Sequence, residues 1–496
     1  MAVKKKKTRK KVGSKVKPKS SFKIKWDWYT IGVIAVAFLV YANTINHGYV
    51  LDDDLVCAKN RYVSSGFSGI GDIFTHSLHE GFTGTPDRNY RPVMMAAFAI
   101  EKQFFGESPQ THHFFNVFWY ALACGLLFLT LRLIFKEHNQ LLPLGIALLF
   151  AAHPIHTEVV ANIKSRDEIF LFLGLMGTVY SVMKYCQKGN LKWLLFGLAA
   201  YLFSALSKES GLAVLGIVPL TAYFFGGQNK TRLFKTTGYF LIPVILYFLL
   251  YFNATGDSGQ QLGITDNSLY AAESLLDRLA TAIAMMGDYL WLLVFPVSLS
   301  YDYSAFQVPI MAWTDFRPIV SLIVWAGLAG FTLWSIVKGN KNLVAYGIGF
   351  FLIMFGMVSN VFFLTGVTMA ERLLFSPSLG FCMILGYYMY EFLFKKGYSN
   401  YFYGLLGVIF VLYSFKTFDR NAVWKSDATL FSTGIHTAPN SSRSNTFYGT
   451  SLFEEAKTIK NVTEQRQKVE EAIAYYDKAL SIYDGFTECH HHKGDA

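Results

Sequence analysis

The chain has 496 residues, of which 52% are hydrophobic and only 16% are charged. Soluble domains carry about 25% charged residues, so this composition excludes an ordinary soluble protein. Apolar runs of about 20 residues, the length that crosses a bilayer as a helix, recur between Tyr29 and Lys416. We therefore expect an all-α, polytopic integral membrane protein.

The net charge of +11 does not indicate nucleic-acid binding, because the charge is concentrated at the N-terminus. Residues 1–25 carry twelve Lys and Arg residues and no acidic residue. A basic segment beside an apolar span is typical of a cytoplasmic anchor that is attracted to anionic lipid. We expect a basic cytoplasmic tail over 1–27, contacts with membrane lipids, and no nucleic-acid partner.

Eleven apolar segments are expected to span the membrane within a domain over 28–416. Lys-rich loops occur at every second connection and so share the cytoplasmic side with the N-terminal tail, as the positive-inside rule requires. The further apolar segment 279–299 contains Asp288 and Pro296, and we expect it to lie in the outer leaflet or to return to its own side. The spans are expected at 28–45, 113–135, 141–160, 167–186, 192–207, 211–226, 237–252, 318–337, 344–363, 375–394 and 400–416.

This topology places two long segments, 46–112 and 253–317, on the outer side together with the C-terminus. After Lys416, amphipathic patterns replace continuous apolar runs. Small and aromatic residues at helical spacing between 472 and 479 resemble the second helix of a tetratricopeptide repeat. We expect 417–496 to begin an outward-facing repeat domain, and we expect it to be incomplete, because about three repeats are needed to bury their faces.

The outer segment 46–112 opens with three adjacent carboxylates, Asp52, Asp53 and Asp54, directly after the first span. Like charges this close raise one another's pKa. A carboxylate at such a position is suited to act as general base toward a hydroxyl nucleophile. A solvated loop is the alternative, but polar groups recur on the same side of the membrane, which favours Asp52 and Asp53 as catalytic residues.

Charged residues recur at the outer ends of other spans, where ionisable side chains usually have a function. Arg presents a fork of donors that matches a phosphate group. A turn pair at 208–209 and an interfacial ion pair at 371–372 are the structural alternatives. The candidates for binding the donor phosphate or the substrate are Arg91, His153, His156, Glu158, Arg166, Lys208, Glu209, Glu371 and Arg372.

His153 and His156 lie one helical turn apart with Glu158 nearby, a spacing that could also form a metal site. The order of residues differs from the His-Glu-x-x-His motif of metalloproteases, and Pro154 disturbs the helix. We therefore assign no metal ligand in this chain, and whether a divalent cation takes part stays open.

Five motifs within residues 46–380 resemble, in their order, the transmembrane and tetratricopeptide-repeat-containing O-mannosyltransferases and their bacterial relatives, which belong to the GT-C class. They are Gly-Tyr-Val-Leu-Asp-Asp, Tyr-Arg-Pro-Val, His-Pro-Ile-His-Thr-Glu, Ser-Lys-Glu-Ser-Gly and Ala-Glu-Arg-Leu. The resemblance implies an outward-facing membrane glycosyltransferase that modifies protein Ser and Thr. It also implies that Asp52 or Asp53 matches the acidic motif of the family.

We therefore expect a GT-C helix bundle that moves a mannose-like sugar from a polyprenyl phosphate to a polypeptide bound by the repeats. One of Asp52 and Asp53 would be the base, and no cofactor is firmly implied. The alternatives are an envelope-glycan or lipid-A-type transferase of the same class and a non-catalytic repeat scaffold. We expect the inner membrane of a bacterium, with the repeats in the periplasm; an endoplasmic reticulum membrane would give the same topology.

Overall fold

The computed structural model describes residues 27–226, 230–256 and 262–496, and these residues form helices and loops without any β-strand. The fold is therefore all-α, as the composition predicts. The basic tail expected over 1–27 lies, apart from Asp27, outside the described residues.

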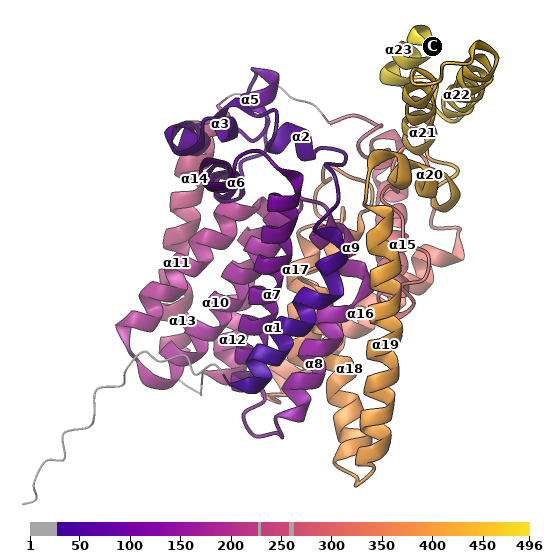
Figure 1. Cartoon of the computed structure of the whole chain (residues 1–496). Helices are drawn as coiled ribbons and strands as arrows, with labels where there is room; N and C mark the ends of the chain where they lie inside the picture. The colour runs from indigo at the N-terminus through magenta and orange to yellow at the C-terminus, as the bar shows by residue number, and fades with distance from the viewer. Residues whose placement is uncertain (1–26, 227–229, 257–261) are drawn as a thin grey trace, which may run out of the picture.

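Each of the eleven expected spans contains an apolar helix, and these helices make up the bundle in Figure 1. Five helices in the described part of the chain are long and apolar enough to cross a bilayer, or six if the bent pair between Leu141 and Ala161 is one span. The other five expected spans correspond to apolar helices that are shorter than a bilayer crossing needs. The eleven-span topology therefore stays a prediction. The bundle helices are α1 (Trp28–Tyr41), α7 (Pro109–Ile134), α8 (Leu141–Ala152), α10 (Arg166–Lys188), α11 (Leu191–Ser207), α12 (Val214–Phe225), α13 (Lys230–Tyr239), α14 (Leu241–Thr255), α16 (Phe316–Val337), α17 (Leu343–Gly356), α18 (Ser378–Met389) and α19 (Ser399–Val423).

Helix α10 packs against three helices of the bundle, α7, α11 and α12. Its contact with α11 is close because Gly174 faces the backbone of that helix: a Cβ atom at Gly174 would lie 2.6 Å from the carbonyl oxygen of Ala200. Small residues at such crossings let helix backbones approach within a membrane. The outer end of α10 is thereby fixed relative to α11.

Two expected spans are interrupted, in each case next to polar residues. The segment 141–160 bends by 50° where α8 ends and the short helix α9 (Thr157–Ala161) follows, because Pro154 cannot continue the helix. Helix α17 ends at Gly356, before the expected end of its span at residue 363. Residues 357–370 form a loop instead, in which Asn360 takes a left-handed conformation with φ +60°.

Helix α15 (Leu275–Val294) is the interrupted apolar segment, and it is amphipathic. It ends before Pro296. Asp288 on its polar face pairs with Arg317 of α16: one guanidinium nitrogen lies 2.6 and 2.7 Å from the two carboxylate oxygens. Leu275, Leu276 and Trp291 are exposed on its surface. An amphipathic helix with a paired charge suits a position in the membrane interface.

The segment 46–112 folds over one end of the bundle as short helices (Figure 1). The longest, α6, begins at Pro92. A proline at the first helical position costs no hydrogen bond, because the N–H group there has no partner within the helix. The helices are α2 (Asp53–Val56), α3 (Arg61–Ser64), α4 (Ile70–Thr75), α5 (Glu80–Thr83) and α6 (Pro92–Phe105).

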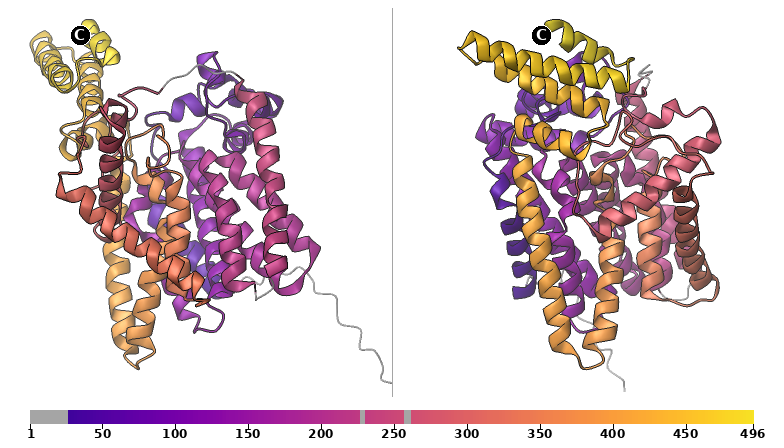
Figure 2. Two further views of the ribbon diagram at one scale, coloured as in Figure 1. Left: turned by 180° about the vertical axis from the view of Figure 1, so that it is seen from behind. Right: turned by 90° about the vertical axis from the view of Figure 1, so that its right-hand side faces the viewer.

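The C-terminal helices lie at the same end of the bundle as α2–α6 (Figure 2). They are α20 (Asp427–Thr437), α21 (Ser442–Ala456), α22 (Val462–Ile482) and α23 (Thr487–Asp495). Helices α21 and α22 pack as an antiparallel pair, with Ala472, Tyr476 and Ala479 buried between them. The buried residues are those of the small-and-aromatic pattern in the sequence, and the tetratricopeptide-repeat domain stays a prediction.

The topology can be tested by cysteine labelling, since all five native cysteines are buried. A cysteine at exposed Lys396, between α18 and α19, should react with an impermeant maleimide only from the cytoplasmic side. A cysteine at exposed Asn440 should react only from the outer side. Labelling of both positions from one side would contradict the eleven-span arrangement.

Candidate functional site

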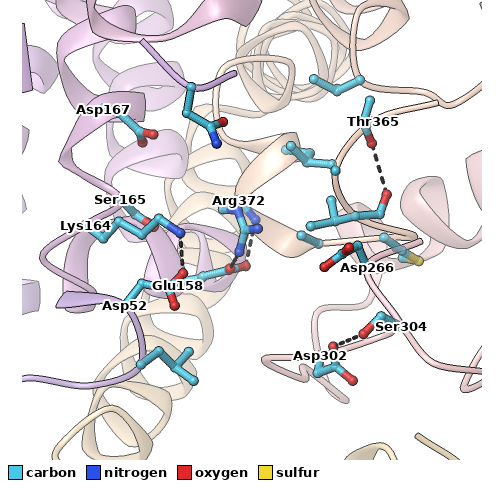
Figure 3. Close-up of a pocket in the computed structure, with 18 of the residues that line it drawn as sticks. Asp52, Glu158, Lys164, Ser165, Asp167, Asp266, Asp302, Ser304, Thr365 and Arg372 are labelled. Carbon is cyan, nitrogen blue, oxygen red and sulfur yellow. Dashed lines mark hydrogen bonds and ion pairs between the residues drawn. The ribbon is translucent and has the colours of Figure 1, made fainter. Parts of the chain in front are cut away.

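A cavity of about 700 Å³ opens at the end of the bundle that carries α2–α6 and α20–α23. One side, the polar wall, comes from loops at the ends of the helices (Figure 3). The other side combines an apolar wall, from the loop 357–370 after α17, with the polar residues Asp266, Asp302, Ser304 and Thr365. Residues of α21 and α23 also belong to the lining. The polar wall comprises Asp52, His79, Asn89, Arg91, Glu158, Lys164, Asp167, Lys208, Glu209 and Arg372; the apolar wall comprises Met357, Val358, Phe363, Leu364, Val367, Met369 and Ala370.

Six of the candidate residues from the sequence meet in this cavity although they are far apart in the chain. They are Asp52, Arg91, Glu158, Lys208, Glu209 and Arg372. The other five lie outside its lining: Asp53, His153, His156, Arg166 and Glu371.

Asp52 projects into the cavity with about half of its side chain exposed, and it pairs closely with the ammonium group of Lys164. That cation is the main reason why the pKa of Asp52 is lowered to about 2. The preceding residue, Leu51, has φ +52° and donates its backbone N–H to the Asp427 carboxylate at 2.9 Å. The start of α20 thus holds the loop that presents Asp52 to the cavity.

Asp53 points away from the cavity and is fully buried. Its Oδ1 accepts the backbone N–H of Lys164 at 2.8 Å, and its Oδ2 accepts that of Val50 at 3.1 Å. Burial raises the pKa of Asp53 to about 7, against the effect of these hydrogen bonds. The two neighbouring carboxylates therefore differ: Asp53 ties two loops together, and Asp52 faces the cavity.

Arg91 is the centre of a charged cluster at the N-terminus of α6. Its guanidinium donates to both oxygens of Glu209, at 3.1 and 2.7 Å, and to Asp167 at 2.6 Å. Lys208 contacts Asp167 at 3.2 Å and Glu168 at 2.9 Å. Two cations and three carboxylates thus cancel most of one another's charge, as buried ionic groups must.

Arg372 pairs with Glu158 rather than with its neighbour Glu371. Its guanidinium contacts Glu158 closely, and its backbone N–H donates to the second oxygen of the same carboxylate at 2.9 Å. Glu371 is buried and accepts hydrogen bonds from Ser300 N at 2.5 Å and from the Tyr303 hydroxyl at 2.8 Å. The adjacent residues thus face different surroundings, and the interfacial ion pair between them does not form.

The remaining candidates hold helices together. His153 lies 3.1 Å from the Leu293 carbonyl oxygen, and His156 lies 2.8 Å from the Ser378 hydroxyl. Arg166 is fully buried, pairs with Glu101 and donates to the His112 carbonyl at 2.7 Å. In the parts of the chain that the structure describes, no three His, Cys, Asp or Glu side chains are grouped so as to hold a metal ion.

Lys164 and His79 also line the polar wall, although neither is among the candidates predicted from the sequence. Lys164 sits at an outer helix end, like the residues that were selected, so the same reasoning could have found it. His79 lies in a loop without periodicity, and its partner Asp87 is revealed only by the fold.

The polar-wall cations differ in accessibility. The side chains of Arg372 and Lys164 are 27% and 22% exposed, whereas those of Arg91 and Lys208 are 11% and 6% exposed. Arg372 and Lys164 are therefore the more accessible cations of the polar wall; Arg443 of α21, which is 24% exposed, lines the cavity elsewhere and pairs with Asp266 at 3.3 Å.

Two family models match the chain. The model described as dolichyl-phosphate-mannose-protein mannosyltransferase matches residues 90–254, and the model described as protein O-mannosyl-transferase TMTC, DUF1736, matches residues 260–329. Together these segments contain α6–α15, including most of the polar wall.

Two solved structures align with most of the chain at low similarity. ArnT from Cupriavidus metallidurans, bound to undecaprenyl phosphate, has a TM-score of 0.41 and 12% identity, over 94% of this chain and 77% of that chain. An oligosaccharyltransferase of Archaeoglobus fulgidus has a TM-score of 0.42 and 11% identity, over 91% of this chain and 59% of that chain.

Curated relatives match nearly the whole chain. Protein O-mannosyl-transferase tmtc2 of Xenopus laevis is 24% identical over 90% of this chain and 61% of its own length. TMTC1 of Homo sapiens is 26% identical over 90% of this chain and 54% of its own length. The chain thus spans less than two thirds of these relatives. As the sequence motifs predict, it is a relative of the protein O-mannosyl-transferase TMTC family.

Proposed function

We propose that this protein transfers a mannose-like sugar from a polyprenyl phosphate to Ser or Thr hydroxyls of a polypeptide. The observation that carries the proposal is the cavity, in which an exposed carboxylate, Asp52, lies beside the accessible cations Lys164 and Arg372, and an apolar wall forms part of the opposite side. A GT-C transferase of this kind needs all three features: a base, a phosphate site and a surface for the lipid.

The phosphate of the donor would lie between Lys164 and Arg372, the accessible cations of the polar wall. The guanidinium of Arg372 has donors left for a second oxyanion after it pairs with Glu158. Arg91 and Lys208 are bound to carboxylates and more deeply buried, so they would support the phosphate site through the charge cluster.

The lipid would contact the apolar wall, whose conformation depends on Asn360. The Asn360 side chain accepts the backbone N–H of Thr365 at 2.8 Å and donates to the Thr368 carbonyl at 2.9 Å. Asn267 donates to the same side chain at 3.0 Å. Residues 365–368 are thereby held in a fixed loop, and the exposed side chains of Phe362 and Phe363 next to it offer apolar surface.

Asp52 is the carboxylate placed to take the proton of the acceptor hydroxyl, since Asp53 is buried. The hydroxyl oxygen attacks the anomeric carbon as its O–H bond breaks. The bond from that carbon to the phosphate oxygen breaks in turn, and its electron pair leaves with the lipid phosphate. A direct displacement inverts the configuration. Within the described residues no three His, Cys, Asp or Glu side chains are grouped so as to hold a metal ion, and no step is assigned to a metal.

The acceptor polypeptide would reach the cavity along the C-terminal helices. Arg443 and Phe447 of α21 and Glu488 of α23 belong to the cavity lining. Helical repeats commonly bind extended chains on their surfaces. A peptide bound to this domain would therefore lie beside the reacting atoms.

This is an integral membrane protein. We further propose that it lies in the inner membrane of a bacterium with the cavity and repeats facing the periplasm. An endoplasmic reticulum membrane with a luminal cavity fits the same topology.

Incubation of the full-length protein in nanodiscs with polyprenyl phosphate mannose and a Ser/Thr peptide should yield mannosylated peptide in a mass spectrum. No transfer to any of a set of peptides would contradict the proposed activity.

The two neighbouring aspartates should respond differently to the same substitution. Asp52→Asn should lower turnover by about 100-fold or more, the scale of a lost general base, with unchanged thermal stability. Asp53→Asn should lower the free energy of unfolding by about 1–3 kcal/mol, because an amide cannot accept both backbone N–H groups. Turnover and melting temperature, measured on both variants, check this. Wild-type turnover of Asp52→Asn would remove it as the base.

Arg372→Met should weaken donor binding more than acceptor binding, because the lost contact is with the lipid phosphate. The single substitution also leaves the buried Glu158 unpaired, so the double variant Arg372→Met/Glu158→Gln restores the charge balance. The matched control is Arg317→Met, which breaks the ion pair with Asp288 outside the cavity.

Isothermal titration with a polyprenyl phosphate measures the affinity of each Arg variant, and thermal unfolding reports its fold. If the double variant binds the lipid phosphate as tightly as Arg317→Met, Arg372 holds the fold together and does not bind the donor.

A further inference from the structure

His79 lines the cavity from the outer loop 76–91 and pairs with a buried carboxylate. Its Nδ1 atom closely contacts Oδ2 of Asp87, and about a fifth of the His79 side chain is exposed. Hydrogen bonds fix the loop on both sides of this pair: Leu78 N donates to the Asn89 carbonyl at 2.8 Å, and Asp87 N donates to the Ser77 hydroxyl at 2.9 Å.

Asp87 is held as the acceptor of this pair. Burial opposes its ionisation, but the hydrogen bonds from His79 and Asn89 outweigh that effect and lower the pKa of Asp87. Asn89 donates both its backbone N–H and its side-chain amide to the carboxylate, each at 3.2 Å. Because a carboxylate only accepts, Nδ1 of His79 carries a proton, and the neutral ring has its lone pair on Nε2.

The Nε2 atom has no hydrogen-bond partner in the part of the chain that the structure describes. It is also not one of the buried side-chain atoms that lack a partner, so it is open to the cavity. The ring lines the same cavity as Asp52 and Arg91. The charged groups around His79 are Asp87 on its own loop, Asp52, Arg91 and, at the next position, Glu80. This is the arrangement of a base oriented by a second carboxylate.

A second base would assist the reaction, because the neighbouring Lys164 cation makes Asp52 a weak base. Its ion pair with Lys164 persists only while Asp52 is charged. A proton taken from the acceptor hydroxyl must therefore pass from Asp52 to a stronger base or to water before the ion pair re-forms. An imidazole is the side chain whose proton affinity suits this transfer near neutral pH.

We propose that His79 receives, on Nε2, the proton that Asp52 takes from the acceptor hydroxyl. This rests on the proposed function. The proton leaves the hydroxyl as the new glycosidic bond forms, passes by way of Asp52 to Nε2, and the resulting imidazolium is stabilised by Asp87. The electron pair of the broken bond leaves with the lipid phosphate. His79 then returns the proton to solvent.

His79→Asn separates this function from the role of His79 in the fold. The Asn amide can replace Nδ1–H as the donor to Asp87, but it offers no base at the position of Nε2. The matched control is His76→Asn, in the same loop but outside the cavity lining, where the ring Nδ1 contacts the Asp72 carbonyl at 3.0 Å. Both variants should melt at the wild-type temperature and bind the lipid phosphate as the wild type does.

The measurement is kcat/KM for sugar transfer as a function of pH, with polyprenyl phosphate mannose and a Ser/Thr peptide. His79→Asn should lower kcat/KM by about 100-fold and alter its dependence on pH, because Asn offers no base at the position of Nε2. His76→Asn should match the wild type. Asp87→Asn should lower kcat/KM less, and imidazole in the buffer should partly restore His79→Ala.

An active His79→Asn variant with the wild-type rate and pH profile would overturn this inference and leave the proposed function intact. A wild-type protein that transfers no sugar would overturn the proposed function and this inference together. His79 would be a structural residue under three combined results. His79→Asn would melt at a lower temperature, Asp87→Asn would keep the wild-type rate, and imidazole would not restore the activity of His79→Ala.

Discussion

The structure depends on the pairing of charges at the outer end of an apolar bundle. A charged side chain that leaves water at this depth is costly unless an opposite charge meets it. Arg91 and Lys208 meet Asp167 and Glu209, and these contacts join α6, α10 and the end of α11. The outer loops are therefore held by ion pairs, and the cavity is the space that these ion pairs surround.

Pairing also determines which groups stay available to a ligand. Lys164 and Arg372 keep part of their side chains in the cavity although each has a carboxylate partner. Both partners, Asp52 and Glu158, face the same space. An anionic donor would thus enter between two ion pairs whose cations are partly exposed, and the buried cluster around Arg91 would stay intact.

The helices, and the gathering of charged residues at one end of the bundle, could be predicted from the sequence, because apolar length and residue charge are local properties. Pairing is not local: Arg372 meets Glu158, and Arg91 meets Glu209. The sequence also could not separate Asp52 from Asp53, since the turn at Leu51, which is held by Asp427 from the far end of the chain, decides which carboxylate faces the cavity.

The central claim is that the cavity binds a polyprenyl phosphate between Lys164 and Arg372. A cryo-electron microscopy map of the full-length protein in nanodiscs, with a non-transferable polyprenyl phosphate sugar, tests it directly. The account predicts phosphate density in contact with both cations and lipid density along the loop 357–370. Phosphate density elsewhere, with Lys164 and Arg372 still paired only with Asp52 and Glu158, would contradict it.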